Sequence, residues 1–91
     1  MDANQPKLVE DLRALGYSVA VTSSLGGGFP DIVVGVRGRN FLFEIKDPEK
    51  VPSKRKLTQD EADFHYGWKG QVCTITTVGG ALQIMKEEFA R

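Results

Sequence analysis

The stretch Phe29–Asp47, FPDIVVGVRGRNFLFEIKD, constrains the fold more than any other part of this chain. Two apolar runs flank Gly38-Arg39, and glycine at the first central position suits a two-residue type II′ turn. Large apolar side chains then share one face of the pleat, and a slip of one residue would scatter them. The predicted facing pairs are Val36 with Phe41, Val34 with Phe43, and Ile32 with Ile45.

The opposite face of this hairpin carries three ionisable residues. Asp31 faces Lys46 in the predicted register, and Asp31 and Glu44 become diagonal neighbours roughly 7–8 Å apart. Two carboxylates about 4 Å apart repel by roughly 4 kcal/mol at an effective dielectric of 20, and a divalent cation would reverse that sign. The pattern fits a metal site, but also an ordinary hairpin with a charged face or an Asp31–Lys46 ion pair.

The same residues form a motif. Pro30-Asp31, twelve intervening residues and then Glu44-Ile45-Lys46 resemble the PD-(D/E)xK nuclease signature. The glycine run before Phe29 and the later segment LTQDEADFHYGWKG resemble the small VRR-NUC branch, the virus-type replication and repair nucleases. The similarity extends from about Asn4 to Ala81. It implies a restriction-endonuclease-like α/β core and a DNA endonuclease.

The resemblance also implies roles for individual residues. Asp31 and Glu44, joined by the backbone carbonyl of Ile45, would hold one or two Mg²⁺ ions, for which Mn²⁺ can substitute. Lys46 would orient the attacking water and stabilise the phosphate. Similar stand-alone proteins act as homodimers on branched DNA, including Holliday junctions, and are common in bacteriophages.

Gln5 departs from the family pattern. Related resolvases often carry a metal-supporting glutamate at the start of the first helix, where this chain has Gln5. A glutamine can offer its carbonyl to a metal-bound water but brings no charge. Gln5 is therefore a candidate catalytic residue or simply a helix-start residue.

Length and composition bound the other possibilities. The 91 residues make one domain, 1–91, with 41% hydrophobic and 26% charged residues, as in soluble globular proteins. No apolar run approaches the ~18 residues of a membrane span. The single cysteine, Cys73, excludes an internal disulfide and fits the cytoplasm, the host cytoplasm if the source is viral.

The formal net charge is zero, but the basic residues are clustered. Residues 37–56 contain seven of the twelve Lys and Arg side chains and only three acids. A phosphate backbone needs such a run, although a solvated loop explains it equally. The candidate DNA-binding residues are Arg37, Arg39, Lys50, Lys54, Arg55 and Lys56.

The remaining pattern predicts the order α-β-β-β-α-β-α, with helices covering a mixed sheet. Helices are expected at 6–15, from Thr58 onward and at 81–89; further strands are expected at 17–22 and 71–76. The core stripe of the first helix would contain Leu8, Val9, Leu12 and Leu15. Ala62, Phe64 and Trp68 would mark the inward face of the second helix, with His65 as a further candidate.

Two residues are left out of the catalytic set. Thr58 followed by Glu61 is a capping-box pattern, which explains Glu61 structurally. His65, the only histidine, cannot build a His-rich zinc site, and a buried or hydrogen-bonded role suits it better than a catalytic one.

Three functions remain open. The first is a Mg²⁺-dependent endonuclease. The second is a degenerate module that grips branched DNA without cutting it, for which Gln5 is the best support. The third is a small partner-binding domain whose charges only solubilise it. DNA cleavage with Mg²⁺ separates the first two, and salt-dependent DNA affinity separates both from the third.

Overall fold

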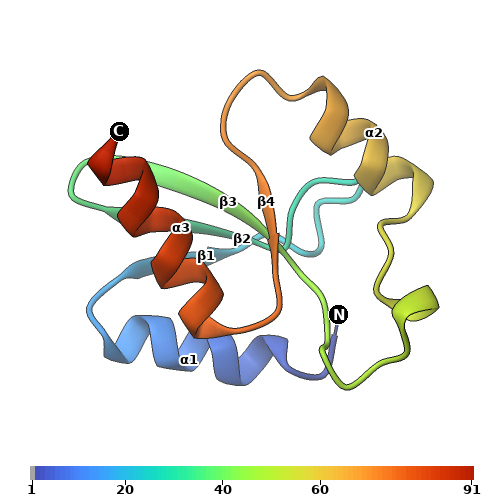
Figure 1. Ribbon diagram of the computed structural model, residues 1–91, viewed down its shortest axis with the longest axis horizontal. Helices are drawn as coiled ribbons and strands as arrows, with labels where there is room; N and C mark the ends of the chain where they lie inside the picture. Colours follow the sequence, from blue (N-terminus) through green and yellow to red (C-terminus); the bar gives the residue numbers. More distant parts are fainter. Residues whose placement is uncertain (1) are drawn as a thin grey trace.

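A computed structural model describes residues 2–91 of the chain. The elements follow the predicted order, with one additional 3-10 turn (Figure 1). Their bounds are α1 Gln5–Ala14, β1 Ser18–Val21, β2 Ile32–Val36, β3 Arg39–Ile45, η1 Pro52–Lys54, α2 Gln59–Gly67, β4 Cys73–Ile75 and α3 Val78–Ala90.

The four strands form one mixed sheet in the order β1-β2-β3-β4. The first three strands are antiparallel, whereas β4 runs parallel to β3. A parallel neighbour requires a crossover connection, and the segment containing η1 and α2 supplies it. The predicted α/β class with a mixed sheet is confirmed.

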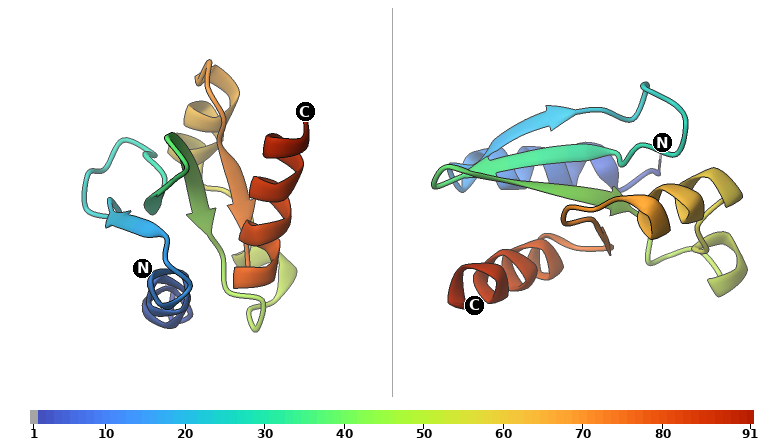
Figure 2. Two further views of the ribbon diagram at one scale, coloured as in Figure 1. Left: turned by 90° about the vertical axis from the view of Figure 1, so that its left-hand side faces the viewer. Right: turned by 90° about the horizontal axis from the view of Figure 1, so that it is seen from above.

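Helices α1 and α3 cover one face of the sheet and contact each other (Figure 2). Their buried side chains meet those of β2, β3 and β4 in a single core. Helix α2 lies beyond the end of the sheet at which β3 finishes and β2 begins (Figures 1 and 2). Within residues 2–91, no helix is both long and apolar enough to cross a membrane. The fold thus leaves the second sheet face uncovered by α1 and α3.

The hairpin register differs from the predicted one by two residues. The observed pairs include Ile32 with Phe43 and Val34 with Phe41. The turn is formed by Arg37 and Gly38, both with positive φ (52° and 79°), which is the requirement of a type I′ turn. The prediction of a type II′ turn at Gly38-Arg39 was wrong.

A shift of two residues leaves each side chain on its predicted face. Five of the six apolar side chains assigned to one face are buried, and Val36 packs against the core they form. Apolar alternation therefore predicts the buried face of the hairpin correctly, whereas the assumed turn at Gly38-Arg39 predicts the wrong cross-strand pairs.

Three other local predictions need correction. Leu15 is 58% exposed, because it caps the end of α1 and lies outside its buried stripe. Helix α3 begins three residues earlier than predicted, at Val78, because Thr77 accepts the N–H of Gly80 and draws both glycines into the first turn. Trp68 follows the end of α2 and is 45% exposed, although its ring stacks on Phe64 at 4.9 Å.

Candidate metal centre

Asp31 and Glu44 meet at the end of the β2–β3 pair. The observed register pairs Ile32 with Phe43, so Asp31 and Glu44 are the next residues outward from this pair, and both line the same cavity. The predicted register placed Asp31 opposite Lys46, so the two-residue shift moves Asp31 from the side of Lys46 to the side of Glu44.

The backbone around Asp31 fixes its carboxylate. Its N–H donates to the carbonyl of Phe43 at 3.1 Å, and its Oδ2 accepts the N–H of Ile45 at 2.7 Å. The carbonyl of Pro30, the residue before it, accepts the Thr22 hydroxyl at 2.7 Å. The side chain of Asp31 therefore serves as the acceptor for the Ile45 N–H in place of a main-chain carbonyl.

Glu44 is a carboxyl group in an unfavourable environment. It is only 2% exposed. Burial, then the adjacent Asp31 and finally Glu61 raise the pKa of Glu44 to about 9. Its Oε1 is buried without a hydrogen-bond partner among residues 2–91. A proton on Glu44 would relieve the repulsion between the carboxylates, and so would a cation.

Lys46, the third signature residue, is paired with a residue outside the signature. Its Nζ lies 2.9 Å from Oε1 of Glu61 and 3.9 Å from Oε2 of Glu44. Burial opposes the charge of the ammonium, but the hydrogen bond and charge of Glu61 prevail and raise the pKa of Lys46. Lys46 is therefore a charged amino group held beside the two carboxylates.

Glu61 reaches the site from the first turn of α2. The predicted capping box is present: Oγ1 of Thr58 accepts the Glu61 N–H at 3.2 Å, and Oε1 of Glu61 accepts the Thr58 N–H at 2.9 Å. Burial opposes ionisation, but the Lys46 and Thr58 bonds prevail and lower the pKa of Glu61. The prediction of a capping role is confirmed. The capping-box pattern does not indicate that Oε1 of Glu61 also binds Lys46.

The glycine run positions α2 against the loop before β2. A Cβ on Gly28 would lie 2.1 Å from the carbonyl oxygen of Asp60 and 2.9 Å from the backbone nitrogen of Glu61. Gly28 also has φ +78°, which strongly favours glycine. Nearby, the ring of Phe29 packs edge-on against Phe64 at 5.2 Å. The close approach at Gly28 thus fits the loop to the turn that carries Glu61.

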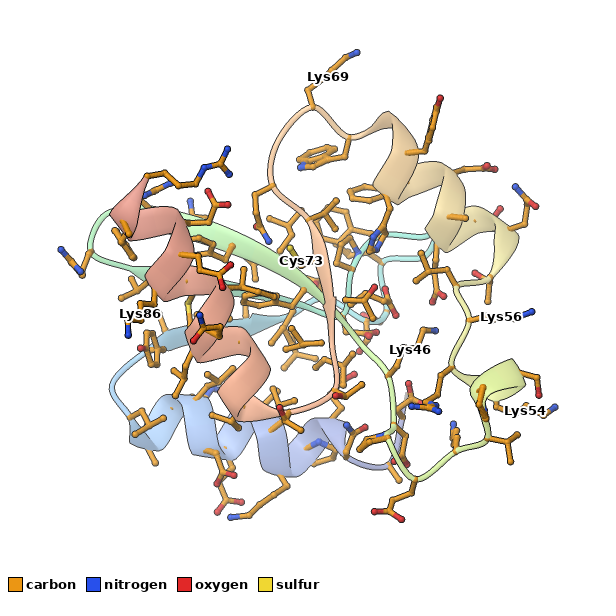
Figure 3. The ribbon with its side chains drawn as sticks, viewed as in Figure 1. Lys46, Lys54, Lys56, Lys69, Cys73 and Lys86 are labelled. Atoms are coloured by element: carbon orange, nitrogen blue, oxygen red, sulfur yellow. The ribbon has the colours of Figure 1, made fainter. Side chains whose placement is uncertain are left out.

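A cavity of about 480 Å³ opens above these groups. Its acidic and basic sides come from different elements: the signature residues lie at the strand ends, and the loop after β3 supplies lysines. Figure 3 shows Lys46 projecting from the end of β3 toward the segment that carries Lys54 and Lys56. The amino groups of Lys54 and Lys56 lie on the side of that segment that faces away from Lys46. The charged lining residues are Asp2, Asp31, Glu44, Lys46, Lys50, Lys54, Lys56 and Glu61.

The six candidate DNA-binding residues therefore fall into two groups. Lys50, Lys54 and Lys56 line the cavity. Arg37 and Arg39 lie at the β2–β3 turn, the other end of the hairpin, where their guanidinium carbons are 4.3 Å and 4.8 Å from the ring of Phe89. Arg55 does not line the cavity, and its Nε is buried without a partner in the described part of the chain.

Gln5 is buried and does not line the cavity. It is 1% exposed and starts α1. Its Nε2 donates to Ser23 at 3.4 Å, while its Oε1 has no partner within residues 2–91. The residue thus serves the helix start, and its free carbonyl oxygen stays a candidate acceptor.

Two further polar side chains lie nearby or were singled out in the sequence. His65 is half-buried, one helical turn beyond Glu61, and its Nε2 has no partner among the described residues. Burial and the charge of Lys46 lower the pKa of His65, while Glu61 opposes the shift. Cys73 is a free thiol, half-buried on β4.

The donor chemistry fits a hard dication. Among residues 2–91, no group of three or more His, Cys, Asp or Glu side chains is arranged to hold a metal by itself. A zinc site needs three or four such ligands, whereas Mg²⁺ binds through one or two carboxylates and keeps several waters. The buried, unpartnered Oε1 of Glu44 is the oxygen such an ion would satisfy.

Searches of protein-family models, curated proteins and solved structures find no significant match to this chain.

Proposed function

We propose that this chain is a metal-dependent endonuclease that hydrolyses DNA phosphodiester bonds, a VRR-NUC-type member of the PD-(D/E)xK superfamily. One observation carries this conclusion. Asp31 and Glu44 line one cavity at the end of the β2–β3 pair, and the charged amino group of Lys46 lies 3.9 Å from Glu44. The three residue types suit phosphate chemistry: oxygen ligands for a hard cation and a compact cation for the phosphate.

The fold gives further support. The order α-β-β-β-α-β-α and a mixed sheet, with the acidic residues at the ends of two central strands, agree with the PD-(D/E)xK core that the motif implies. Because one fold can support unrelated activities, this agreement supports the proposal but is not sufficient for it.

The metal ligands would be the carboxylates of Asp31 and Glu44 and the backbone carbonyl of Ile45. The side chain of Ile45 is buried in the core, so only its backbone can serve the site. When bound, Mg²⁺ or Mn²⁺ lowers the pKa of a water nucleophile and neutralises charge that develops on the phosphate. Gln5, whose Oε1 has no donor among residues 2–91, would offer its carbonyl oxygen to a metal-bound water.

Lys46 would act on the substrate directly. The Lys46 side chain is 10% exposed. Its ammonium group therefore lines the cavity while being largely removed from water. In such surroundings a fixed cation stabilises the charge of the pentacovalent phosphate more strongly than in water. The same group orients the attacking water by hydrogen bonding.

The DNA backbone would enter along the lysine-bearing loop. Lys50, Lys54 and Lys56 can contact phosphates on either side of the scissile one, which positions the strand without reading its sequence. A 91-residue chain covers little duplex, so a homodimer acting on a branched substrate such as a Holliday junction suits the small domain.

Cleavage assays test this function. Four-way junctions, flaps and linear duplexes are incubated with the protein and Mg²⁺, Mn²⁺ or Ca²⁺. We expect Mg²⁺ and Mn²⁺ to support nicking of branched DNA, and Asp31→Ala and Lys46→Ala to abolish it. Retained cutting by both variants would refute the assignment. Tight, salt-dependent binding by the wild-type protein with all strands intact would instead identify a degenerate DNA-binding module, the alternative that Gln5 favours.

A further inference from the structure

The carboxylate of Glu61 is bound twice at one oxygen. Oε1 accepts the backbone N–H of Thr58 and the ammonium of Lys46, both at 2.9 Å. We propose that Glu61 is a positioning residue that holds the Lys46 ammonium away from Glu44, and so keeps the Glu44 carboxylate open to a divalent cation. This role rests on the proposed nuclease function and adds a residue outside its motif.

Of the two partners, Glu61 is the fixed one. The capping box ties both its main chain and its side chain to Thr58, and the close fit of Gly28 against the same turn fixes the start of α2. Lys46, by contrast, ends a flexible four-carbon stem with rotatable donors. The contact between them therefore sets the location of the ammonium.

Without Glu61, the nearest other acceptor of Lys46 is Glu44, already 3.9 Å away. A largely buried ammonium left unpaired is costly, so Lys46 would close the remaining distance. Its positive charge would then occupy the side of Glu44 that a divalent cation needs. A lysine drawn onto Glu44 would both compete with the metal and leave its place beside the substrate.

The other charged groups around Lys46 do not replace Glu61. Asp2 contributes to the field at Lys46, but its Oδ1 is bound to Lys50 at 2.5 Å. Asp31 is held by the N–H of Ile45. His65 faces the same pair from the next turn of α2 and has no acidic oxygen to offer.

Metal affinity measured without DNA isolates this role. Mn²⁺ binding is followed by calorimetry or electron paramagnetic resonance for E61Q, E61A, T58A and D60N. Gln keeps the capping box, so E61Q removes only the charge. T58A weakens the same helix start as E61A but leaves the partner of Lys46, and D60N neutralises an exposed acid in the same turn. All four melting temperatures are recorded.

We expect Mn²⁺ affinity close to wild type in D60N and T58A. Loss of a group that orients a metal ligand typically lowers affinity about 10–100-fold, so E61A should fall in that range and E61Q between E61A and wild type. The decisive comparison uses Lys46→Met. If Glu61 acts through Lys46, E61A in the Lys46→Met background leaves Mn²⁺ affinity unchanged, a non-additive double-mutant cycle.

Equal Mn²⁺ affinity in E61A and T58A would overturn the role of Glu61, as would an equal loss in both Lys46 backgrounds, which indicates a direct charge effect. Cleavage of junction DNA by the wild-type chain is scored in parallel. If the wild-type chain binds Mn²⁺ but cuts no DNA, the nuclease function is overturned. If the wild-type chain cuts DNA and the Mn²⁺ affinity of E61A equals that of wild type, only the inference about Glu61 is overturned.

Discussion

The carboxylate of Asp31 accepts a 2.7 Å hydrogen bond from the backbone N–H of Ile45. One oxygen of the aspartate therefore stabilises β3, and the charge of the same group serves the candidate metal centre. These two contributions can be separated by substitution.

Asp31→Asn should keep the fold and abolish cation-dependent cleavage. The asparagine oxygen can still accept the Ile45 N–H, but the group carries no charge for the metal. Asp31→Ala should abolish cleavage and also lose about 1.5–3 kcal/mol of stability, the usual contribution of a hydrogen bond to a charged group. Urea denaturation and junction cleavage measure the two effects. Cutting by Asp31→Asn at the wild-type rate would contradict the metal role.

Glu44→Gln should stabilise the metal-free protein at pH 8. The carboxyl titrates near 4.5 when unfolded and near 9 when folded, so between these values the folded state holds the extra proton. Stability therefore falls as pH rises from about 4.5 to 9. One pKa unit corresponds to about 1.4 kcal/mol, and 1 kcal/mol shifts Tm by about 4–8 °C in a domain this size.

Melting curves in EDTA at pH 5, 7 and 8 test that prediction. Wild type should lose stability across the series, and Glu44→Gln should lose less. Glu10→Gln, at an exposed site on α1, is the matched control and should follow wild type. If the Glu44→Gln protein is less stable than wild type at pH 8, the buried carboxyl group does not destabilise the fold.

Lys46→Met should separate binding from chemistry. Methionine fills much of the volume of the lysine stem but has no charge to orient water or stabilise the phosphate. Losing one such electrostatic group typically lowers kcat about 10²–10³-fold. Binding of junction DNA in Ca²⁺, measured by anisotropy, should remain within about twofold, since phosphate contacts elsewhere dominate affinity. A matching loss of affinity and rate would assign Lys46 to binding alone.

The lysines of the cavity loop should contribute to the salt dependence of DNA binding. The double variant Lys54→Ala/Lys56→Ala should reduce the slope of log K against log salt by about 1.8, since each phosphate contact contributes about 0.9. Lys69→Ala/Lys86→Ala removes the same charge from exposed sites away from the cavity (Figure 3) and should leave the slope nearly unchanged. Equal slopes for the two double variants would place the DNA elsewhere.

Gly28→Ala should destabilise the protein more than Gly26→Ala. Both glycines have positive φ, at which a side chain costs about 1–2 kcal/mol. Only at Gly28 would the new Cβ also meet the carbonyl of Asp60, and such overpacking costs about 1–3 kcal/mol more. Urea midpoints give the ranking. Equal losses would mean that the loop and α2 separate easily.

Alternation of apolar residues predicted the buried face of the hairpin because that face depends only on parity. The turn is different: Gly38 satisfies either of two adjacent two-residue turns, and only the observed φ of Arg37 (52°) decides between them. That ambiguity moved Asp31 from the side of Lys46 to the side of Glu44. The acidic pair could be predicted from sequence, but the register that sets its two members side by side could not.

Glu61 shows a second limit. The capping-box pattern explains Glu61 completely at the level of local structure and does not indicate a second role for it. Its second contact is with Lys46, fifteen positions away, and arises from the placement of α2 beyond the sheet. One signal was available: Lys46 needs an acidic partner if it is buried, and Glu61 lies in the first turn of the helix that follows the loop.

The dependence of Lys46 on the start of α2 has a consequence for biosynthesis. During translation, the ribosome completes Asp31, Glu44 and Lys46 before it adds Glu61. If Glu61 keeps the lysine off Glu44, a nascent chain that ends before the second helix contains the whole motif and no working centre. Activity would then begin only when the crossover to β4 has been made.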